Sequence, residues 1–158
     1  MEPRHGALRS GHVAREAMMK PGYGWVFTAL LCMALGLAGV ATAGEREAAA
    51  QEAAERWLLL VDDGEYVSSW NEAAEAFRAQ LSPEAWEQAV GNARDPLGEV
   101  LARSLVVAQY ASSLPGVPDG DYVVMQYSTR FEHKADGVET VTARLEDGDW
   151  RVIGYFVR

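Results

Sequence analysis

Residues 121–134 read DYVVMQYSTRFEHK, and the alternation of apolar and polar side chains in this stretch decides the fold. Every second residue from Val123 onward belongs to a mostly apolar set that ends at His133, whereas Arg130 and Glu132 belong to the other set. A period of two is typical of a strand with one buried face. We therefore predict a half-buried strand whose charged residues alternate between two faces and do not converge on one site.

Three more strands are predicted around this one. They read EVLARSLVVAQYASS at 99–113, VETVTARLE at 138–146 and WRVIGYFVR at 150–158. The connections contain Pro, Asp and Gly, among them the Asp-Gly pairs at 136–137 and 147–148, which are typical of tight turns. Short turns between successive strands predict an antiparallel meander.

The residues before these strands have the helical period instead. Apolar side chains recur at spacings of three and four in 45–64 and again in 66–81. A third helix is expected to start at Ser82, which can cap free amides, with Pro83 in its first turn. The predicted fold class is therefore α+β, with three N-terminal helices packed on one face of a four-stranded antiparallel meander sheet.

The N-terminal part of the chain has a different composition. Residues 25–43 read WVFTALLCMALGLAGVATA, carry no charge and follow Lys20. A basic flank, an apolar centre and small residues at the end are the layout of a secretory signal, here with cleavage after Ala43. The apolar centre lies far from Met1, so we expect translation to start at Met18 or Met19.

This layout predicts two parts, an N-terminal extension plus signal peptide at 1–43 and a single exported domain at 44–158. The expected location is the periplasm or the medium. The alternative is an uncleaved single-pass membrane anchor with the domain outside, because about twenty apolar residues can span a bilayer. In both cases the domain faces outward.

Charge and cysteine content exclude several classes of function. Residues 44–158 keep ten of the 14 Lys and Arg and 21 of the 23 Asp and Glu, so their net charge is −11. A domain this acidic repels phosphate backbones and anionic lipid surfaces, so we expect no nucleic-acid partner. Cys32 lies in the apolar run, so residues 44–158 contain no cysteine for a disulfide or a thiolate nucleophile.

A set of motifs then resembles a known family. They are ERWLLLVDDGEYVSSWNEAAEAF, Leu97-Gly98, Arg103, LPG, PDGDY and GDWRVIGYFVR, which together cover nearly all of residues 47–158. They resemble the bacterial secreted domain-of-unknown-function family 4019. The order of helices and strands is also similar to the cystatin-like and nuclear-transport-factor-like cone folds. This resemblance implies a curved sheet that encloses a cavity against the helices, and it implies no particular activity.

Enzymes built on cone folds need a carboxylate or histidine inside the cavity, and the candidates are Asp62, Asp63 and His133. The two aspartates precede Gly64 at a helix end, and His133 lies at a strand end with no second titratable group on its face. At such positions these residues are typical of solvated helix ends and strand ends, so no catalytic residue is assigned. We also expect no metal site and no cofactor, because metal-ligand and nucleotide-binding motifs are lacking.

Arg103 stands out because it interrupts an apolar strand segment. A buried guanidinium requires a carboxylate or several carbonyls, so the structural interpretation is a pair with a helix carboxylate such as Glu72 or Glu75, or else plain exposure on the outer face. The functional interpretation is a ligand-binding set that holds an acidic ligand at a cavity mouth. The predicted set is Arg103, Tyr127, Trp70 and Tyr155.

The sequence therefore favours an exported binding or interaction module without catalytic activity, which uses a cone cavity or the open sheet face. Its partner is an unknown small ligand or protein, and a homodimer through the sheet face is one form of this prediction. The alternative is a small cone-fold enzyme with isomerase- or dehydratase-like acid–base chemistry on a hydrophobic substrate. Asp62 or His133 would then be the base, and Tyr127 or Tyr155 would stabilise developing charge.

Overall fold

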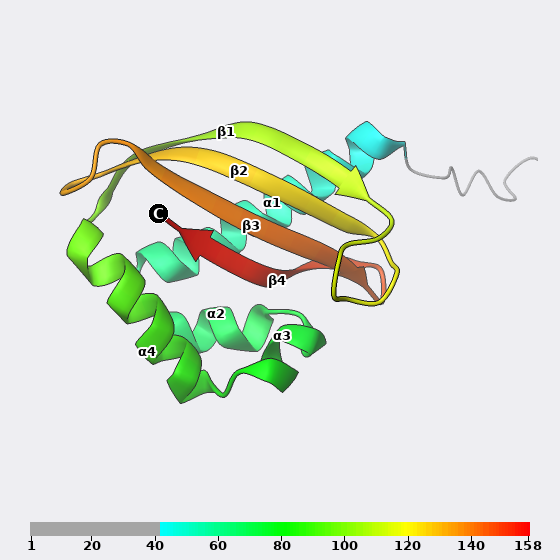
Figure 1. Cartoon of the computed structure of the whole chain (residues 1–158), viewed down its shortest axis with the longest axis horizontal. Helices are drawn as coiled ribbons and strands as arrows, with labels where there is room; N and C mark the ends of the chain where they lie inside the picture. Colours follow the sequence, from blue (N-terminus) through cyan, green and yellow to red (C-terminus); the bar gives the residue numbers. More distant parts are fainter. Residues whose placement is uncertain (1–41) are drawn as a thin grey trace, which may run out of the picture. The chain divides into compact units, whose positions relative to one another are not determined.

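The computed structural model describes residues 42–158, in which helices come first and the strands of one sheet follow (Figure 1). The elements are α1 (Ala43–Asp62), α2 (Tyr66–Glu72), α3 (Glu75–Gln80), α4 (Pro83–Arg94), the 3₁₀ helix η1 (Asp95–Leu97), β1 (Val100–Ala111), β2 (Tyr122–Phe131), β3 (Gly137–Glu146) and β4 (Asp149–Val157). The strands pair antiparallel in the order β1-β2-β3-β4. The predicted α+β meander is thus confirmed.

Side-chain caps define where two of the helices begin. Thr42 and Glu45 form a capping box at the start of α1, in which each side chain accepts a hydrogen bond from the backbone amide of the other residue. The helix therefore starts inside the predicted cleavage motif, and the apolar run before Thr42 lies outside the described residues. At α4 the Ser82 hydroxyl accepts from the Ala85 amide at 3.2 Å, with Pro83 as the first helical residue, as predicted.

The second predicted helix, 66–81, is wrong as a continuous element. The backbone is extended at Ala73 and Ala74, which separate α2 from α3. The Ala74 amide donates to the Val152 carbonyl of β4 at 2.9 Å, and both alanines are fully buried. Because β4 is an edge strand, its outward carbonyl needs a donor, and this contact outweighs the helical propensity of alanine.

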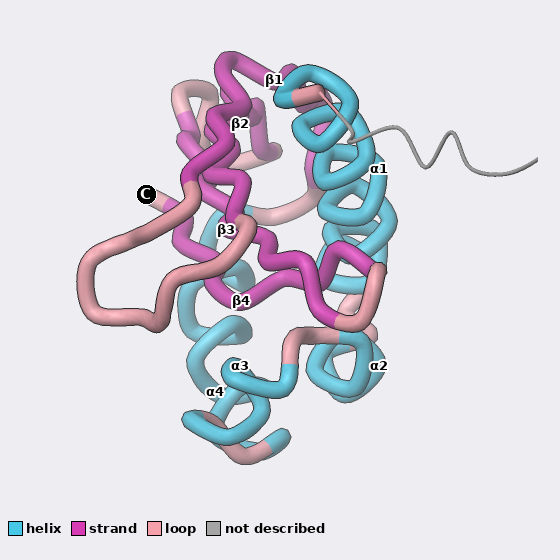
Figure 2. Tube along the Cα trace, turned by 90° about the vertical axis from the view of Figure 1, so that its right-hand side faces the viewer, coloured by secondary structure: helices cyan, strands magenta, loops and turns pink. Residues whose placement is uncertain are grey.

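The sheet has the two faces that the alternation predicted. Val123, Met125, Tyr127, Thr129 and Phe131 of β2 are all buried, whereas their outward neighbours from Val124 to Arg130 are partly or fully exposed. Figure 2 shows α1 alongside the strands and α2, α3 and α4 below them. Within residues 42–158, α1 is the helix that contacts all four strands, and no helix covers the outer face of the sheet.

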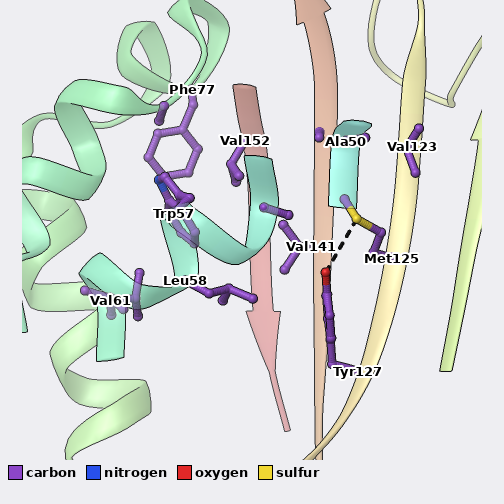
Figure 3. Packing of buried hydrophobic residues seen from close by; sticks show 14 of the residues in the cluster. Ala50, Trp57, Leu58, Val61, Phe77, Val123, Met125, Tyr127, Val141 and Val152 are labelled. Carbon is purple, nitrogen blue, oxygen red and sulfur yellow. Dashed lines mark hydrogen bonds between the residues drawn. The ribbon is translucent and has the colours of Figure 1, made fainter. Parts of the chain in front are cut away.

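The core lies between α1 and the inner face of the sheet (Figure 3). Trp57 and Leu58 of α1 meet Val141 and Met125 of the sheet, and each of these side chains is at most 2% exposed. Large side chains thus fill the space where the fold resemblance implied a cavity. No helix within residues 42–158 is long and apolar enough to cross a membrane.

Candidate functional site

Two charged side chains are buried beneath this apolar core. Glu139 is fully buried in β3 and Arg94, the last residue of α4, is 5% exposed. Asp62 at the end of α1 and Arg103 in β1 lie against them, with side chains 17% and 14% exposed. Four elements that are distant in the sequence thus each contribute one charge to the same place.

The two guanidinium groups alternate with the two carboxylates. Arg94 bridges Asp62 and Glu139 at 2.8 and 2.9 Å, and Arg103 bridges the same two carboxylates at 2.7 and 2.6 Å. The formal charges cancel, which is the condition under which burial of ions is tolerated. We call Asp62, Arg94, Arg103 and Glu139 the ion quartet.

Hydroxyl groups complete the hydrogen bonding of Glu139. Tyr155 donates to its Oε1 at 2.7 Å, and the Thr129 hydroxyl donates to its Oε2. Tyr155 in turn accepts from Nη1 of Arg94 at 3.1 Å. The Nε of Arg94 has no hydrogen-bond partner among the described residues, and its guanidinium lies 4.8 Å from the centre of the Phe131 ring.

Burial and ion pairing shift the pKa values of these groups in opposite directions. Burial acts to raise the pKa of Glu139, but the hydrogen bonds and charge of Arg103, with those of Thr129 and Tyr155, outweigh it and hold that pKa below its usual value. Burial acts to lower the pKa of Arg103, and its bonds to Asp62 and Glu139 raise it overall. Burial and the nearby Glu139 raise the pKa of Tyr155. Glu139 therefore stays ionised and Tyr155 stays neutral near pH 7, which suits a structural role rather than proton transfer.

A groove opens beside the quartet, between α1 and β1. It has a volume of about 370 Å³ and is lined by Glu55, Leu59, Arg103, Leu105 and Tyr127. Leu59 is 60% exposed at its rim, and Tyr127 is buried beneath it. Burial, together with the charge of Glu55, raises the pKa of Tyr127 to about 12. The groove thus has apolar residues on both walls, and its charged lining residues are Arg103 and Glu55.

Arg103 keeps one donor for this groove. A guanidinium has five N–H groups, and four of those of Arg103 are used in bonds to Asp62 and Glu139. The remaining N–H belongs to Nη1 and has no partner within residues 42–158. Because Arg103 lines the groove, we consider this N–H the candidate hydrogen-bond donor for a molecule there.

The predicted ligand-binding residues separate into two groups. Arg103 and Tyr127 share the groove. Trp70 lies elsewhere, with its indole N–H donating to the Leu81 carbonyl at 2.7 Å. Tyr155 donates to Glu139 of the quartet, and its ring is tilted against that of Trp57 with 5.6 Å between the ring centres. The expected structural pair of Arg103 with a helix carboxylate is present, but the carboxylate is Asp62 and not Glu72 or Glu75, and Glu139 of β3 is a second partner.

The candidate bases do not come together. Asp62 is held by two arginines, and Asp63 is an exposed helix cap. The His133 side chain is 59% exposed and its Nε2 lies 3.8 Å from a Glu132 oxygen. In the described part of the chain, no group of three or more His, Cys, Asp or Glu side chains is arranged to hold a metal ion.

Two members of the quartet, Arg94 and Glu139, were missed at the sequence level. Glu139 carried a signal, since it shares a strand face with Val141 and Ala143 and so had to point inward. Arg94 carried none, because a basic residue at a helix end is ordinary on a solvated surface. Only the closure of the fold brings it to Glu139.

Three further hollows lie on the surface of residues 42–158. One of about 450 Å³ is bordered by Trp57, Trp150 and charged residues of α1 and β4. One of about 340 Å³ is rimmed by carboxylates such as Asp62 and Asp95, and one of about 190 Å³ separates α4 from β4. Of these hollows and the groove, only the groove contains two of the predicted ligand-binding residues.

Comparison with known proteins gives one family and a set of similar solved structures. A family described as protein of unknown function (DUF4019) matches residues 53–155. Among 24 solved chains that match is the crystal structure of an NTF-2 like protein of unknown function from Silicibacter pomeroyi. It shares 16% identity at a TM-score of 0.47, and the alignment covers 75% of this chain and 98% of that one. A search of curated proteins gave no match.

Proposed function

The chain belongs to the DUF4019 family, and we propose that it is a binding module without catalytic activity that takes its ligand in the groove between α1 and β1. One observation carries this proposal. The buried charges of the quartet satisfy each other, whereas the adjacent groove combines an exposed Leu59 with an unused N–H of Arg103. Apolar walls with a single oriented polar group are typical of small-ligand sites.

The charges near the groove indicate what kind of ligand it takes. The positive charge of Arg103 is balanced by Asp62 and Glu139, and Glu55 adds a negative charge at the rim. An acidic ligand would therefore meet net repulsion, in contrast to the expectation from an unpaired Arg103. We propose a neutral ligand with an apolar body and one hydrogen-bond acceptor, such as a ketone, ester or amide carbonyl.

Binding of the neutral dye Nile red, which has an apolar body and a carbonyl, tests the groove. We expect saturable binding with a blue shift in emission. Leu59→Asp should weaken it at least about tenfold, because a leucine side chain contributes roughly 1.5–3 kcal/mol when buried. Val67→Asp is the matched control, since Val67 is 50% exposed on α2 and borders none of the four hollows described above. Equal affinities of the two variants, or no saturable binding, would refute the proposal.

A pair of matched ligands tests the role of Arg103 without changing the quartet. A long-chain ketone should bind about ten- to a hundredfold more tightly than the alkane of equal length, because a hydrogen bond to a charged donor contributes roughly 1.5–3 kcal/mol. Calorimetric titration in a low concentration of neutral detergent measures both. Equal binding of ketone and alkane would contradict a role for the Arg103 N–H.

We also propose that the module works outside the cytoplasm, on the strength of the apolar run and small-residue motif at 25–43. Cleavage after Ala43 would remove Thr42 and with it the cap of α1. N-terminal sequencing of the chain recovered from bacterial cells tests this, with Gly44 expected as the first residue. An intact N-terminus on a membrane-bound chain would indicate the anchor instead.

A further inference from the structure

The last residues of β4 form a free edge of the sheet. Arg158 and Val138 exchange both of their backbone hydrogen bonds, at 3.1 and 3.0 Å, so the backbone of Arg158 points toward β3. In an antiparallel pair, positions whose backbone groups point toward the partner strand alternate with positions whose groups point away from it. The register is regular from Val157 back to Tyr155. The N–H and C=O groups of Tyr155 and Val157 therefore point away from β3, and no backbone group of another element within residues 42–158 pairs with them.

The chain itself covers the first half of the same edge. The extended residue Ala74 donates its amide to the Val152 carbonyl, and α3 packs beside it. The one irregularity in the pairing of β3 with β4 lies next to this contact, between Thr142 and Ala143. Proteins protect free edges with such contacts, with bulges, or with proline and lysine, and Tyr155–Val157 has none of these. The end of β4 is thus open to an added strand, as its first half already shows on a small scale.

A hollow of about 190 Å³ lies beside this open edge, between β4 and α4. Figure 1 shows the end of β4, marked C, beside α4. The α4 residues that line the hollow share one helical face; they are Trp86, Ala89, Val90 and Ala93. Ala89 and Ala93 stay exposed because α4 packs mainly on α2 and η1. The hollow is smaller than the roughly 300–1,000 Å³ of small-molecule pockets, so it suits one apolar side chain of an extended segment.

The exposed charges of α4 and η1 indicate the charge of that segment. Glu84, Glu87 and Asp95 are exposed, whereas the only basic residue of these two helices, Arg94, is buried in the quartet. Arg158 supplies one positive charge after the free edge, so negative charges still predominate. The domain as a whole has a net charge of −11. A basic segment is therefore attracted to this side of the domain, and an acidic one is repelled.

We propose that an extended segment of a partner protein, in which basic residues alternate with valine or leucine, adds to β4 as a fifth strand between β4 and α4. Its backbone pairs with Tyr155 and Val157, and one of its apolar side chains occupies the hollow. The hollow shares no lining residue with the groove between α1 and β1. This binding site is therefore separate from the site of the proposed function.

Fluorescence polarisation with the full chain and a labelled peptide of sequence KVKLKVK measures this binding. We expect saturable binding of KVKLKVK and none of the acidic peptide EVELEVE. Ala89→Leu should weaken binding at least about tenfold, because the larger side chain fills the hollow. Gln88→Leu is the matched control, since Gln88 is exposed on α4 and does not line the hollow. Equal binding by the two variants, or of the two peptides, would contradict the proposal.

Two versions of KVKLKVK that are N-methylated at alternate residues test the backbone pairing. The amides of a strand point alternately to its two sides, so only one version loses the donors that face β4. That version should bind at least about tenfold more weakly than the other. Nile red binding in the groove should be the same for Ala89→Leu and wild type, which distinguishes a failure here from a failure of the proposed function.

Hydrogen exchange followed by NMR locates the added strand. In the free chain, the Tyr155 and Val157 amides should exchange faster than the Phe156 amide, which points toward β3. Saturation with KVKLKVK should slow exchange at Tyr155 and Val157 at least about tenfold. No saturable binding, equal binding of the two N-methylated peptides, or unchanged exchange at these amides would each overturn the inference. Protection in the free chain that grows with protein concentration would also overturn it, because a second copy would then occupy the edge.

Discussion

Replacing Glu139 with glutamine is expected to destabilise the domain by about 3–5 kcal/mol, the range found when one partner of a buried ion pair is removed. The carboxylate is fully buried and accepts five hydrogen bonds, one from Arg94, two from Arg103 and one each from Thr129 and Tyr155. The amide nitrogen of glutamine would face donors on either side. Two guanidinium groups would then share the single charge of Asp62, which leaves one buried positive charge uncompensated.

Chemical denaturation of the wild-type chain and the variant measures this change. A loss of this size lowers the melting temperature by on the order of 10–20 °C for a domain of about 120 residues. Glu132→Gln is the control, because the Glu132 side chain is 54% exposed and its replacement should change stability by no more than about 0.5 kcal/mol. A loss below about 1 kcal/mol for Glu139→Gln would refute the conclusion that the quartet stabilises the fold.

A double variant separates charge balance from packing. Arg103→Met with Glu139→Gln leaves Arg94 and Asp62 as one neutral pair. The double variant should therefore lose less stability than the two single variants together, by about 2 kcal/mol. Strictly additive losses would mean that charge balance is not the source of the effect.

The single variant Glu139→Gln should also change how the stability of the domain depends on acidic pH. The pKa of Glu139 is lower in the folded chain than in the unfolded one, so folding favours its ionised form. Its contribution is present above the unfolded pKa of about 4.3 and is lost as the pH falls through the folded value. The stability difference between wild type and Glu139→Gln should therefore narrow below about pH 4. A difference that stays constant down to pH 2 would contradict this.

Two more predictions concern single buried positions. Tyr127→Phe should change stability by less than about 1 kcal/mol at pH 7, because the hydroxyl contacts only the sulfur of Met125 at 3.6 Å. Folding raises the pKa of Tyr127 to about 12, so its contribution to the free energy of unfolding is lost as the pH rises above about 10. Tyr127→Phe should therefore lose less stability than wild type in that range. Identical unfolding curves at alkaline pH would exclude this. Gly137→Ala should destabilise by about 1–3 kcal/mol in urea denaturation, because its Cβ would lie 2.5 Å from the Phe131 ring. Gly154→Ala, whose Cβ would meet its nearest neighbour at 3.8 Å, should be close to neutral, and equal effects of the two substitutions would argue against crowding.

Sequence patterns of short range determined most of the architecture. The alternation in 121–134 predicted the buried set of β2 from Val123 to Phe131, although Tyr122 of the other set is also buried, and the Ser82-Pro83 pair predicted the start of α4. These signals succeed because a strand face, a cap or a turn depends on residues within a few positions of each other. For the same reason Glu139 was predictable as an inward residue, but its partners were not.

Only the tertiary structure decided the pairing of charges and the interruption of the second helix. Asp62, Arg94, Arg103 and Glu139 come from four elements and meet only when the sheet closes over α1 and α4. The chain likewise leaves the helical conformation at Ala74 because a carbonyl of β4, 78 residues later at Val152, needs a donor. Local propensity fixes where a helix can form, whereas the hydrogen-bond and charge requirements of buried groups are set by neighbours that folding brings from elsewhere in the chain.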